Sequence, residues 1–353
     1  MITDPRVFED DHLPREMLHR EGAIETLLRA WDHTRLGEAG DEVIIAGPSG
    51  VGKTALARHT LKRLGERAAI DHAHVRCLGA TPATILRAVC QAVGAEPPGN
   101  AATEAIQTHL AESVARPTIV ILDEADDLPE SPALELMAGV PQLSTVVITH
   151  DLNHWLARAT NTHDRYAGAT QLTLGRYGVA ELADILGARA RAGLPRGVVD
   201  RGQLERIADT VAGVAREGIQ ALRAAAELAA ERGHSRIESE DVDDSFEQAR
   251  HRIRCANLQS LPYHHHVLYA ILFESGQLDG VTLHDRYDTV AEAAYADHHL
   301  TPVGKRSRRN KLKKLIAYDL VAREGPKHDP TYVVVDADVE PSIQPLREAG
   351  SLK

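Results

Sequence analysis

No run of 18 apolar residues occurs in the sequence, so no segment is long and apolar enough for a membrane-spanning helix. The first six residues are too acidic and polar for a secretory signal peptide. Only three cysteines are present, and Cys77, Cys90 and Cys255 lie far apart without a C-x-x-C pair. This spacing disfavours a disulfide framework and a zinc site. We therefore expect a cytoplasmic protein with no membrane partner and with buried thiols.

Polar low-complexity tracts are also missing, which argues against long disordered segments. A hydrophobic fraction of 43% supplies enough apolar side chains for packed cores, and 353 residues correspond to about two to three domains. Histidines cluster at 264–266 and at 298–299, but the sequence places no further ligand near either cluster. We expect no metal ion at these histidines.

The charge of the chain is unevenly distributed. The net charge is -11, yet seven of the ten residues from 305 to 314 are Lys or Arg. From 300 to 327 there are nine basic and two acidic residues, which leaves 31 basic against 49 acidic residues elsewhere. Positive charge concentrated in an acidic chain indicates a nucleic-acid contact, because neutralising phosphates supplies much of such affinity. A solvated charged helix or a localisation signal would produce the same run.

A glycine-rich loop joins a short apolar strand at 41–46 to a helix that continues through 55–61. Its pattern is G-x-x-x-x-G-K-[ST], in which backbone amides surround phosphate oxygens at a helix N-terminus. Lys53 should reach the β- and γ-phosphates, and Thr54 should ligate Mg²⁺. The pattern predicts a nucleotide site formed by Gly47, Pro48, Ser49, Gly50, Val51, Gly52, Lys53 and Thr54.

A second apolar strand at 118–122 is followed by Asp123 and Glu124. Such a strand suits the centre of a parallel sheet covered on both faces. Asp123 would hold Mg²⁺ through water, and Glu124 would polarise the attacking water. A strand followed by a solvated acidic turn is the structural alternative. Further strands at 74–77 and 145–149 each precede a helix, which predicts a doubly wound α/β domain.

The C-terminal half has helical periodicity. Apolar residues at helical spacing from 179 to 254 predict a small bundle, which could close over the nucleotide or be a passive subdomain. Beyond 257 the pattern predicts three helices and a β-hairpin, the arrangement of a winged helix-turn-helix. The expected parts are an α/β domain at 1–175, a helical lid at 176–256, a winged-helix domain at 257–340 and a tail at 341–353.

The basic run forms the third of these helices. Leu312, Leu315 and Ile316 define its core stripe. Successive helical residues turn by about 100°, so cationic side chains lie opposite that stripe and on its flanks. A helix with this face suits the major groove of double-stranded DNA, where arginines read guanine edges. The predicted DNA contacts are Lys305, Arg306, Arg308, Arg309, Asn310 and Lys313 on the helix and Lys327 on the hairpin turn.

Several segments share their order with a known family. They are His19-Arg20-Glu21 after Leu13-Pro14, the acidic box at 123–126, a tyrosine-led helix start at Tyr177, and a helix beginning at Ser239. Together they resemble the AAA+ class and, within it, the archaeal origin-recognition-type replication initiators, over nearly the whole chain. The resemblance implies ATP or ADP with Mg²⁺ as cofactor, Tyr177 at the nucleotide, and double-stranded origin DNA as partner. It also implies a nucleoid-associated location, recruitment of the replicative helicase, and self-association on DNA.

The sequence departs from the family at the positions that act on the γ-phosphate. His150 replaces a polar residue, usually Asn, although a neutral imidazole can still donate to phosphate or orient water. Ile219 stands where the family has a lid arginine, and Arg216 lies one helical turn away. An arginine acting in trans would be Arg165 or, alternatively, Arg158. We therefore expect nucleotide binding with slow hydrolysis.

Three functions are compatible with this pattern. The first is an ATP-dependent replication initiator that recognises origin DNA and recruits the replicative helicase. The second is a nucleotide-locked winged-helix transcriptional regulator with little or no ATPase activity, which the changes at His150 and Ile219 favour. The third is a signalling ATPase whose winged helix binds protein.

Overall fold

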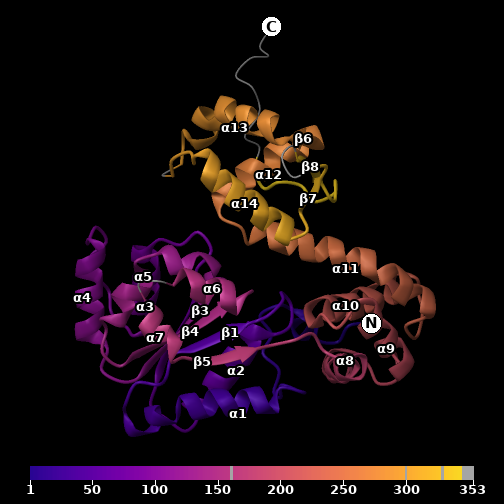
Figure 1. Cartoon of the computed structure of the whole chain (residues 1–353). Helices are drawn as coiled ribbons and strands as arrows, with labels where there is room; N and C mark the ends of the chain where they lie inside the picture. Colours follow the sequence, from indigo (N-terminus) through magenta and orange to yellow (C-terminus); the bar gives the residue numbers. More distant parts are fainter. Residues whose placement is uncertain (160–161, 299, 327–329, 344–353) are drawn as a thin grey trace. The chain divides into compact units, whose positions relative to one another are not determined.

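The computed structural model describes residues 1–159, 162–298, 300–326 and 330–343. The chain divides into two compact units, Met1–Ser245 and Phe246–Lys353 (Figure 1). The boundary falls inside helix α11 (Ser239–Gln259). The finer domain boundaries expected after residues 175 and 256 remain predictions. Among the described residues, no helix is both long enough and apolar enough to cross a membrane.

Five parallel strands form the sheet of the first unit, in the order β2-β3-β4-β1-β5. Strands β1 and β4 are buried throughout, and β3 is buried up to its last residue, so apolar residues predominate in all three, and the polar residues of β4 are the small Ser and Thr. Strand β5 is short and half exposed, so no sequence pattern indicates it. The predicted α/β fold is confirmed. The strands are β1 (Val43–Ala46), β2 (Asp71–Arg76), β3 (Thr118–Asp123), β4 (Leu143–Thr149) and β5 (Thr170–Thr173).

Helices cover both faces of this sheet (Figure 1). Ile119 and Ile121 of β3 pack with α1 (Glu21–Ala30) and α2 (Lys53–Gly65). The 3-10 helix η2 (Asp32–Leu36) follows α1 and contacts it. Val120 and Leu122 of the same strand pack into the cluster on the opposite face. That face is covered by α3 (Pro82–Ala92), α4 (Thr103–Ser113), the 3-10 helix η3 (Ala125–Glu130), α5 (Ala133–Ala138), α6 (Leu152–Arg158) and α7 (His163–Ala167).

The remaining helices of the first unit form the lid. They are α8 (Val179–Gly193), α9 (Arg201–Thr210), α10 (Ala215–Glu231) and the beginning of α11. The 3-10 helix η1 (Pro5–Phe8) packs into this bundle, and Phe8 is fully buried. Arg189 donates a hydrogen bond to the Val7 carbonyl at 2.6 Å, and Gln220 donates to the Phe8 carbonyl at 2.8 Å. The N-terminal segment is therefore packed against the lid.

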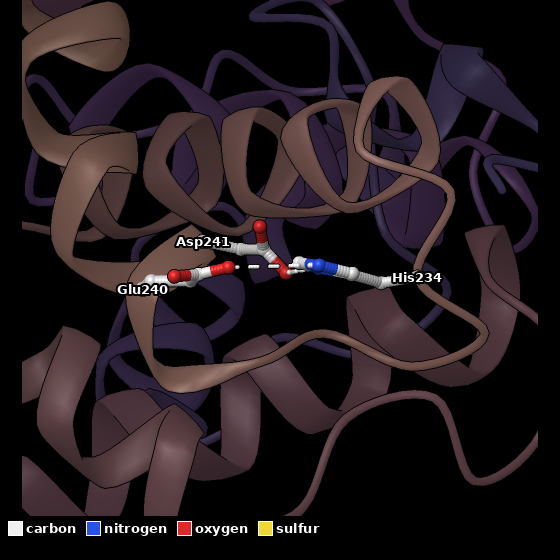
Figure 2. Close-up of side chains that lie close together, drawn as sticks. All are labelled: His234, Glu240 and Asp241. Atoms are coloured by element: carbon white, nitrogen blue, oxygen red, sulfur yellow. Dashed lines mark hydrogen bonds and ion pairs between the residues drawn. The ribbon is translucent and has the colours of Figure 1, made fainter.

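The turn between α10 and α11 is fixed by Asp241, whose side chain is fully buried. Its Oδ1 accepts a hydrogen bond from Arg232 at 3.0 Å, and its Oδ2 accepts from the Glu238 amide at 2.8 Å. His234 Nδ1 lies 2.8 Å from Oδ2, and Glu240 lies 3.5 Å from the other ring nitrogen (Figure 2). The spacing of His234, Glu240 and Asp241 would admit a cation. Because both Asp241 oxygens already have partners, one of them a guanidinium, the cluster acts as a helix cap.

The second unit has the element order of a winged helix-turn-helix. It contains α12 (Tyr263–Ser275), α13 (Gly280–Tyr295) and α14 (Lys305–Ala317), with an antiparallel sheet in the order β6-β8-β7. The predicted fold of this unit is confirmed. The sequence pattern does not indicate the short strand β6, which precedes α13. The strands are β6 (Gln277–Asp279), β7 (Val321–Glu324) and β8 (Thr331–Val334).

Arg254 anchors the end of α11 within the second unit. Arg254 is 8% exposed, and its guanidinium lies 2.7 Å from the Asp319 carboxylate and 3.2 Å from that of Asp336. These acids follow α14 and β8, respectively. Removing the carboxylates from this nearly buried guanidinium would destabilise the fold, because a buried charge would be left without a partner.

Gly193 lies where the lid packs tightly against the N-terminal segment. A Cβ at this position would lie 2.3 Å from a Val7 methyl carbon and 2.6 Å from the Phe8 ring. We expect Gly193→Ala to destabilise the protein by about 1–3 kcal/mol, because overpacking displaces buried side chains. Thermal unfolding measures the loss. Gly65→Ala is the matched control, since nothing lies within 4 Å of its Cβ position. Equal unfolding temperatures for Gly193→Ala and Gly65→Ala would contradict the close packing of Gly193 against Val7 and Phe8.

His234 should make lid stability depend on pH. The hydrogen bond to Asp241 raises the pKa of its imidazole above the usual value of about 6.5. The resulting stabilisation is fully present below the unfolded-state pKa and is lost as the pH rises through the folded-state pKa. His234→Gln should therefore lower the melting temperature more at pH 5.5 than at pH 8.5. An equal loss at both pH values would exclude the charged pair.

Candidate nucleotide site and DNA-binding helix

The phosphate-binding loop connects β1 to α2 at the carboxyl edge of the sheet. Gly47, Gly50 and Gly52 have φ values of 144°, 75° and 90°, a region that residues with a Cβ rarely adopt. A Cβ on Gly47 would lie 2.2 Å from the Leu174 carbonyl oxygen. The backbone conformation therefore requires these glycines. It allows the amides at the start of α2 to point toward a common site that suits a phosphate group.

Lys53 lies inside this loop. Its ammonium donates to the Gly47 carbonyl at 2.7 Å and to the Pro48 carbonyl at 2.8 Å, and the residue is 9% exposed. Backbone carbonyls are neutral acceptors, so a phosphate oxygen would bind the ammonium more strongly. The lysine is therefore positioned where its predicted ligand would be.

Thr54 and Asp123 meet although they are far apart in the sequence. Thr54 Oγ1 donates to Asp123 Oδ2 at 2.9 Å, while Oδ1 accepts from the Glu124 amide at 2.9 Å. Burial alone would raise the pKa of the Asp123 carboxyl, but hydrogen bonds from His74 and Thr54 outweigh burial and hold it below its usual value. A hydroxyl and an ionised carboxylate are oxygen ligands that Mg²⁺ accepts. These two residues fit the metal ion expected from the sequence.

Glu124 is restrained by an arginine from the edge strand. Its φ is 53°, and its Oε1 accepts a hydrogen bond from Arg76 Nε at 3.0 Å. Arg76 lies opposite Asp123 in the β2–β3 register. Sequence reasoning missed Arg76 and its neighbour His74. The available signal was the alternation of β2, in which His72, His74 and Arg76 are exposed while Ala73 and Val75 are buried.

His150 lies at the carboxyl end of β4, beside the acidic segment. Its Nδ1 is 2.8 Å from Asp126 Oδ2, and its amide donates to Oδ1 at 2.9 Å. Thr149 Oγ1 donates to the same carboxylate at 2.7 Å. Burial of Asp126 would raise its pKa, but these hydrogen bonds and the His150 ring hold it well below its usual range. The structure thus orients the ring of His150, while its role in catalysis remains a prediction.

Arg165, predicted to act in trans, makes internal contacts in this structure. Its Nε donates to Glu42 at 2.8 Å, and its guanidinium also donates to the Leu143 carbonyl at 3.1 Å. Both partners lie at the amino ends of β1 and β4, at the edge opposite the phosphate-binding loop. Through these contacts, Arg165 links α7 to the amino ends of β1 and β4. Arg158, the alternative, donates to the Asp126 carbonyl at 2.8 Å.

Tyr177 borders the phosphate-binding loop. A Cβ on Gly52 would lie 3.7 Å from the Tyr177 hydroxyl and 3.9 Å from the methyl carbon of Met17. The Arg20 guanidinium lies 4.0 Å from the centre of the Tyr177 ring, and Arg20 Nε donates to its hydroxyl at 3.0 Å. Burial raises the pKa of the Tyr177 hydroxyl, and Arg20 partly offsets this effect. The segment at 19–21 and the start of the lid therefore meet beside the loop.

The lid approaches the phosphate-binding loop through the start of α10. The Arg216 amide donates to the Gly50 carbonyl at 3.1 Å, and Arg216 Nε donates to Asp10 at 3.0 Å. Ile219 is half-buried one turn further along α10. Arg216 is thus a lid cation whose backbone contacts the loop and whose guanidinium pairs with the N-terminal segment.

The basic helix α14 presents most of its polar side chains to solvent. Leu312 and Leu315 are 1% and 0% exposed, and they fix the inward face. The exposed set contains five of the predicted DNA contacts: Lys305, Arg306, Arg309, Asn310 and Lys313. Lys327 lies outside the residues that the structure describes.

Arg308 corrects the prediction for this helix, because its side chain is buried. It is 5% exposed and lies one turn before Leu312, on the core side. Its guanidinium donates to the Val303 carbonyl at 2.7 Å and to the His284 carbonyl at 3.1 Å, pairs with Asp288, and stacks on a tyrosine ring. Arg308 therefore stabilises the winged helix internally, and its expected DNA contact is wrong.

Two family models match the first unit. The AAA ATPase domain matches residues 16–160, and the Cdc6 AAA+ ATPase-type lid domain matches residues 183–247. The first range contains the phosphate-binding loop and the acidic segment. The second contains α9, α10 and the Asp241 cap. The order of the two models is that of the α/β core and the lid.

Several known proteins match most of the chain. The ORC1-type DNA replication protein 9 of Halobacterium salinarum is 29% identical over 97% of this chain and 96% of its own length. The ORC1-type DNA replication protein 1 of the same organism is 28% identical over 82% of this chain and 96% of its own. The structure of the Aeropyrum pernix ORC1 protein in complex with DNA has a TM-score of 0.75 and 23% identity, covering 96% of this chain and 95% of that one. This structural likeness supports the fold. The two domain models and these relatives show that the chain belongs to the archaeal ORC1/Cdc6-type family of AAA+ ATPases.

Proposed function

We propose that this chain is a replication initiator that binds ATP and Mg²⁺ in its first unit and double-stranded DNA through α14. One observation supports this proposal: the chain contains both kinds of site. Its phosphate-binding loop is formed, with Thr54 hydrogen-bonded to Asp123, and its winged-helix unit has a basic helix that faces solvent. The names of the relatives, ORC1-type DNA replication proteins, support the same role.

In the nucleotide site each residue has a distinct role. Lys53 would exchange its loop carbonyls for the β- and γ-phosphates. Thr54 and Asp123 would hold the metal ion, which would neutralise phosphate charge. Glu124 accepts the proton of the attacking water, but Arg76 competes for its carboxylate. Ile219 supplies no charge to the transferred phosphoryl group. Turnover is therefore slow.

In the second unit, the exposed side chains of α14 contact DNA. The remainder of the chain is acidic, so phosphates are repelled from most other surfaces. Arg306 and Arg309 can each donate two hydrogen bonds to a guanine edge, and Lys313 neutralises a phosphate. A relative, the Aeropyrum pernix ORC1 protein, was solved in complex with DNA, which supports this assignment. Origin recognition, helicase recruitment, self-association on DNA and a nucleoid location belong to the same proposal.

A second function is favoured by the restrained catalytic carboxylate. Arg76 occupies the carboxylate of Glu124, and Ile219 provides no lid cation, so both features slow hydrolysis. A chain that stays bound to nucleotide would act as a DNA-binding transcriptional regulator. Genome-wide binding of the tagged protein distinguishes the two functions. Binding concentrated at replication starts supports the initiator, and binding at many promoters without enrichment at a replication start would reject it.

The nucleotide assignment predicts separate effects for two variants. Lys53→Ala should weaken ATP binding by about 2–3 kcal/mol, because a charge-assisted phosphate contact is lost. Glu124→Gln should retain ATP while abolishing turnover, and wild-type turnover should stay below roughly 10 s⁻¹. Labelled-nucleotide binding and multiple-turnover assays, with and without DNA, measure these quantities. Unchanged binding in Lys53→Ala, or rapid wild-type hydrolysis, would contradict this prediction.

The DNA assignment predicts strong salt dependence. With roughly four to six phosphates neutralised, log affinity should fall against log salt with a slope of about -4 to -5. Lys313→Ala should reduce the steepness of that slope by about one, and Arg309→Ala should cost roughly 1–3 kcal/mol at a preferred sequence. Arg63→Ala, an exposed cation on α2, is the matched control for the change in charge. If Arg63→Ala weakens binding as much as Lys313→Ala, the contact does not lie on α14.

A further inference from the structure

Three metal-ligating atoms converge at the carboxyl edge of the sheet. Thr54 Oγ1 and His74 Nε2 lie 2.9 Å and 3.1 Å from the same oxygen, Asp123 Oδ2. They come from α2, β2 and β3, so the fold itself brings them together. An oxygen pair of this kind suits Mg²⁺, whereas the imidazole adds a nitrogen that the family resemblance does not account for.

The place of His74 on the edge strand determines where its ring can point. β2 pairs only with β3 in this sheet, and its buried residues, Ala73 and Val75, pack on the opposite face. The side chain of His74 is 37% exposed and that of Asp123 is 18% exposed. The ring therefore lies between solvent and the carboxylate, where an arriving ion can reach both.

The two separations from Asp123 Oδ2 agree with those of neighbouring ligands on one ion. An octahedral divalent ion with bonds of about 2.1 Å keeps adjacent ligand atoms about 3.0 Å apart. As a hydrogen-bond donor to the Asp123 carboxylate, the neutral His74 ring carries its proton on Nε2. In the ion-bound arrangement, the neutral ring carries its proton on Nδ1 and offers the Nε2 lone pair, so no net proton is gained or lost.

Imidazole nitrogen changes which ions such a site prefers. Mg²⁺ favours oxygen ligands and retains its waters, while Mn²⁺ and other first-row transition ions accept both oxygen and imidazole nitrogen. We propose that His74 is a ligand of the divalent ion beside Thr54 and Asp123, and that it shifts the nucleotide site from Mg²⁺ toward a transition-metal ion such as Mn²⁺. This inference rests on the proposed nucleotide function.

Calorimetric titration of ADP into the full-length protein, with Mn²⁺ or with Mg²⁺, tests the metal preference. The wild-type ratio of the two affinities should exceed that of His74→Gln by about tenfold, because losing a metal partner typically costs ten- to a hundredfold. His72→Gln is the matched control, since it removes an exposed histidine two residues earlier on the same strand. It should keep the wild-type ratio.

Pulsed electron paramagnetic resonance of the Mn²⁺–ADP complex gives a second readout. A nitrogen coupling from a directly bound imidazole should appear in the wild type and in His72→Gln and disappear in His74→Gln. The wild-type spectrum decides the matter even if His74→Gln fails to fold. Absence of the coupling, or equal affinity ratios in wild type and His74→Gln, overturns the inference while the nucleotide site stands. No ADP binding with either ion overturns the proposed function as well.

Discussion

The parallel register of the sheet is the constraint on which the nucleotide site depends. Parallel strands end at one edge, so β1, β2, β3 and β4 deliver their following residues to the same place. The hydrogen bond from Thr54 to Asp123 forms across this edge. The apolar runs that create the register are buried on both faces, so the positions of the polar side chains are set by the core beneath them.

Four cations around the nucleotide site have internal partners. Lys53 binds loop carbonyls, Arg76 holds Glu124, Arg216 holds Asp10, and Arg20 lies on Tyr177. A nucleotide would have to replace some of these contacts, and two of them join the α/β core or the N-terminal segment to the lid. Binding should therefore change how the lid is held, because the same cations cannot serve both partners at full strength.

The sequence was most informative where burial is complete. β1, β3 and β4 are predictable because central parallel strands are buried on both faces and therefore contain apolar runs. The phosphate-binding loop is predictable because the backbone requires its glycines. β5 and β6 were not predictable, since short, half-exposed strands carry no periodic signal. Charge counting predicted the basic helix but misplaced Arg308, whose burial depends on tertiary partners such as His284 and Asp288. His74 and Arg76 were missed for a related reason, because their roles depend on a neighbouring strand.

A structure of the full chain with a non-hydrolysable ATP analogue and a divalent ion tests the central claim most directly. The Lys53 ammonium should leave the Gly47 and Pro48 carbonyls for the β- and γ-phosphates, with Thr54 and Asp123 at the ion. A nucleotide bound elsewhere, or bound at this loop with Lys53 still on both carbonyls, would contradict the assignment of this edge of the sheet as the nucleotide site.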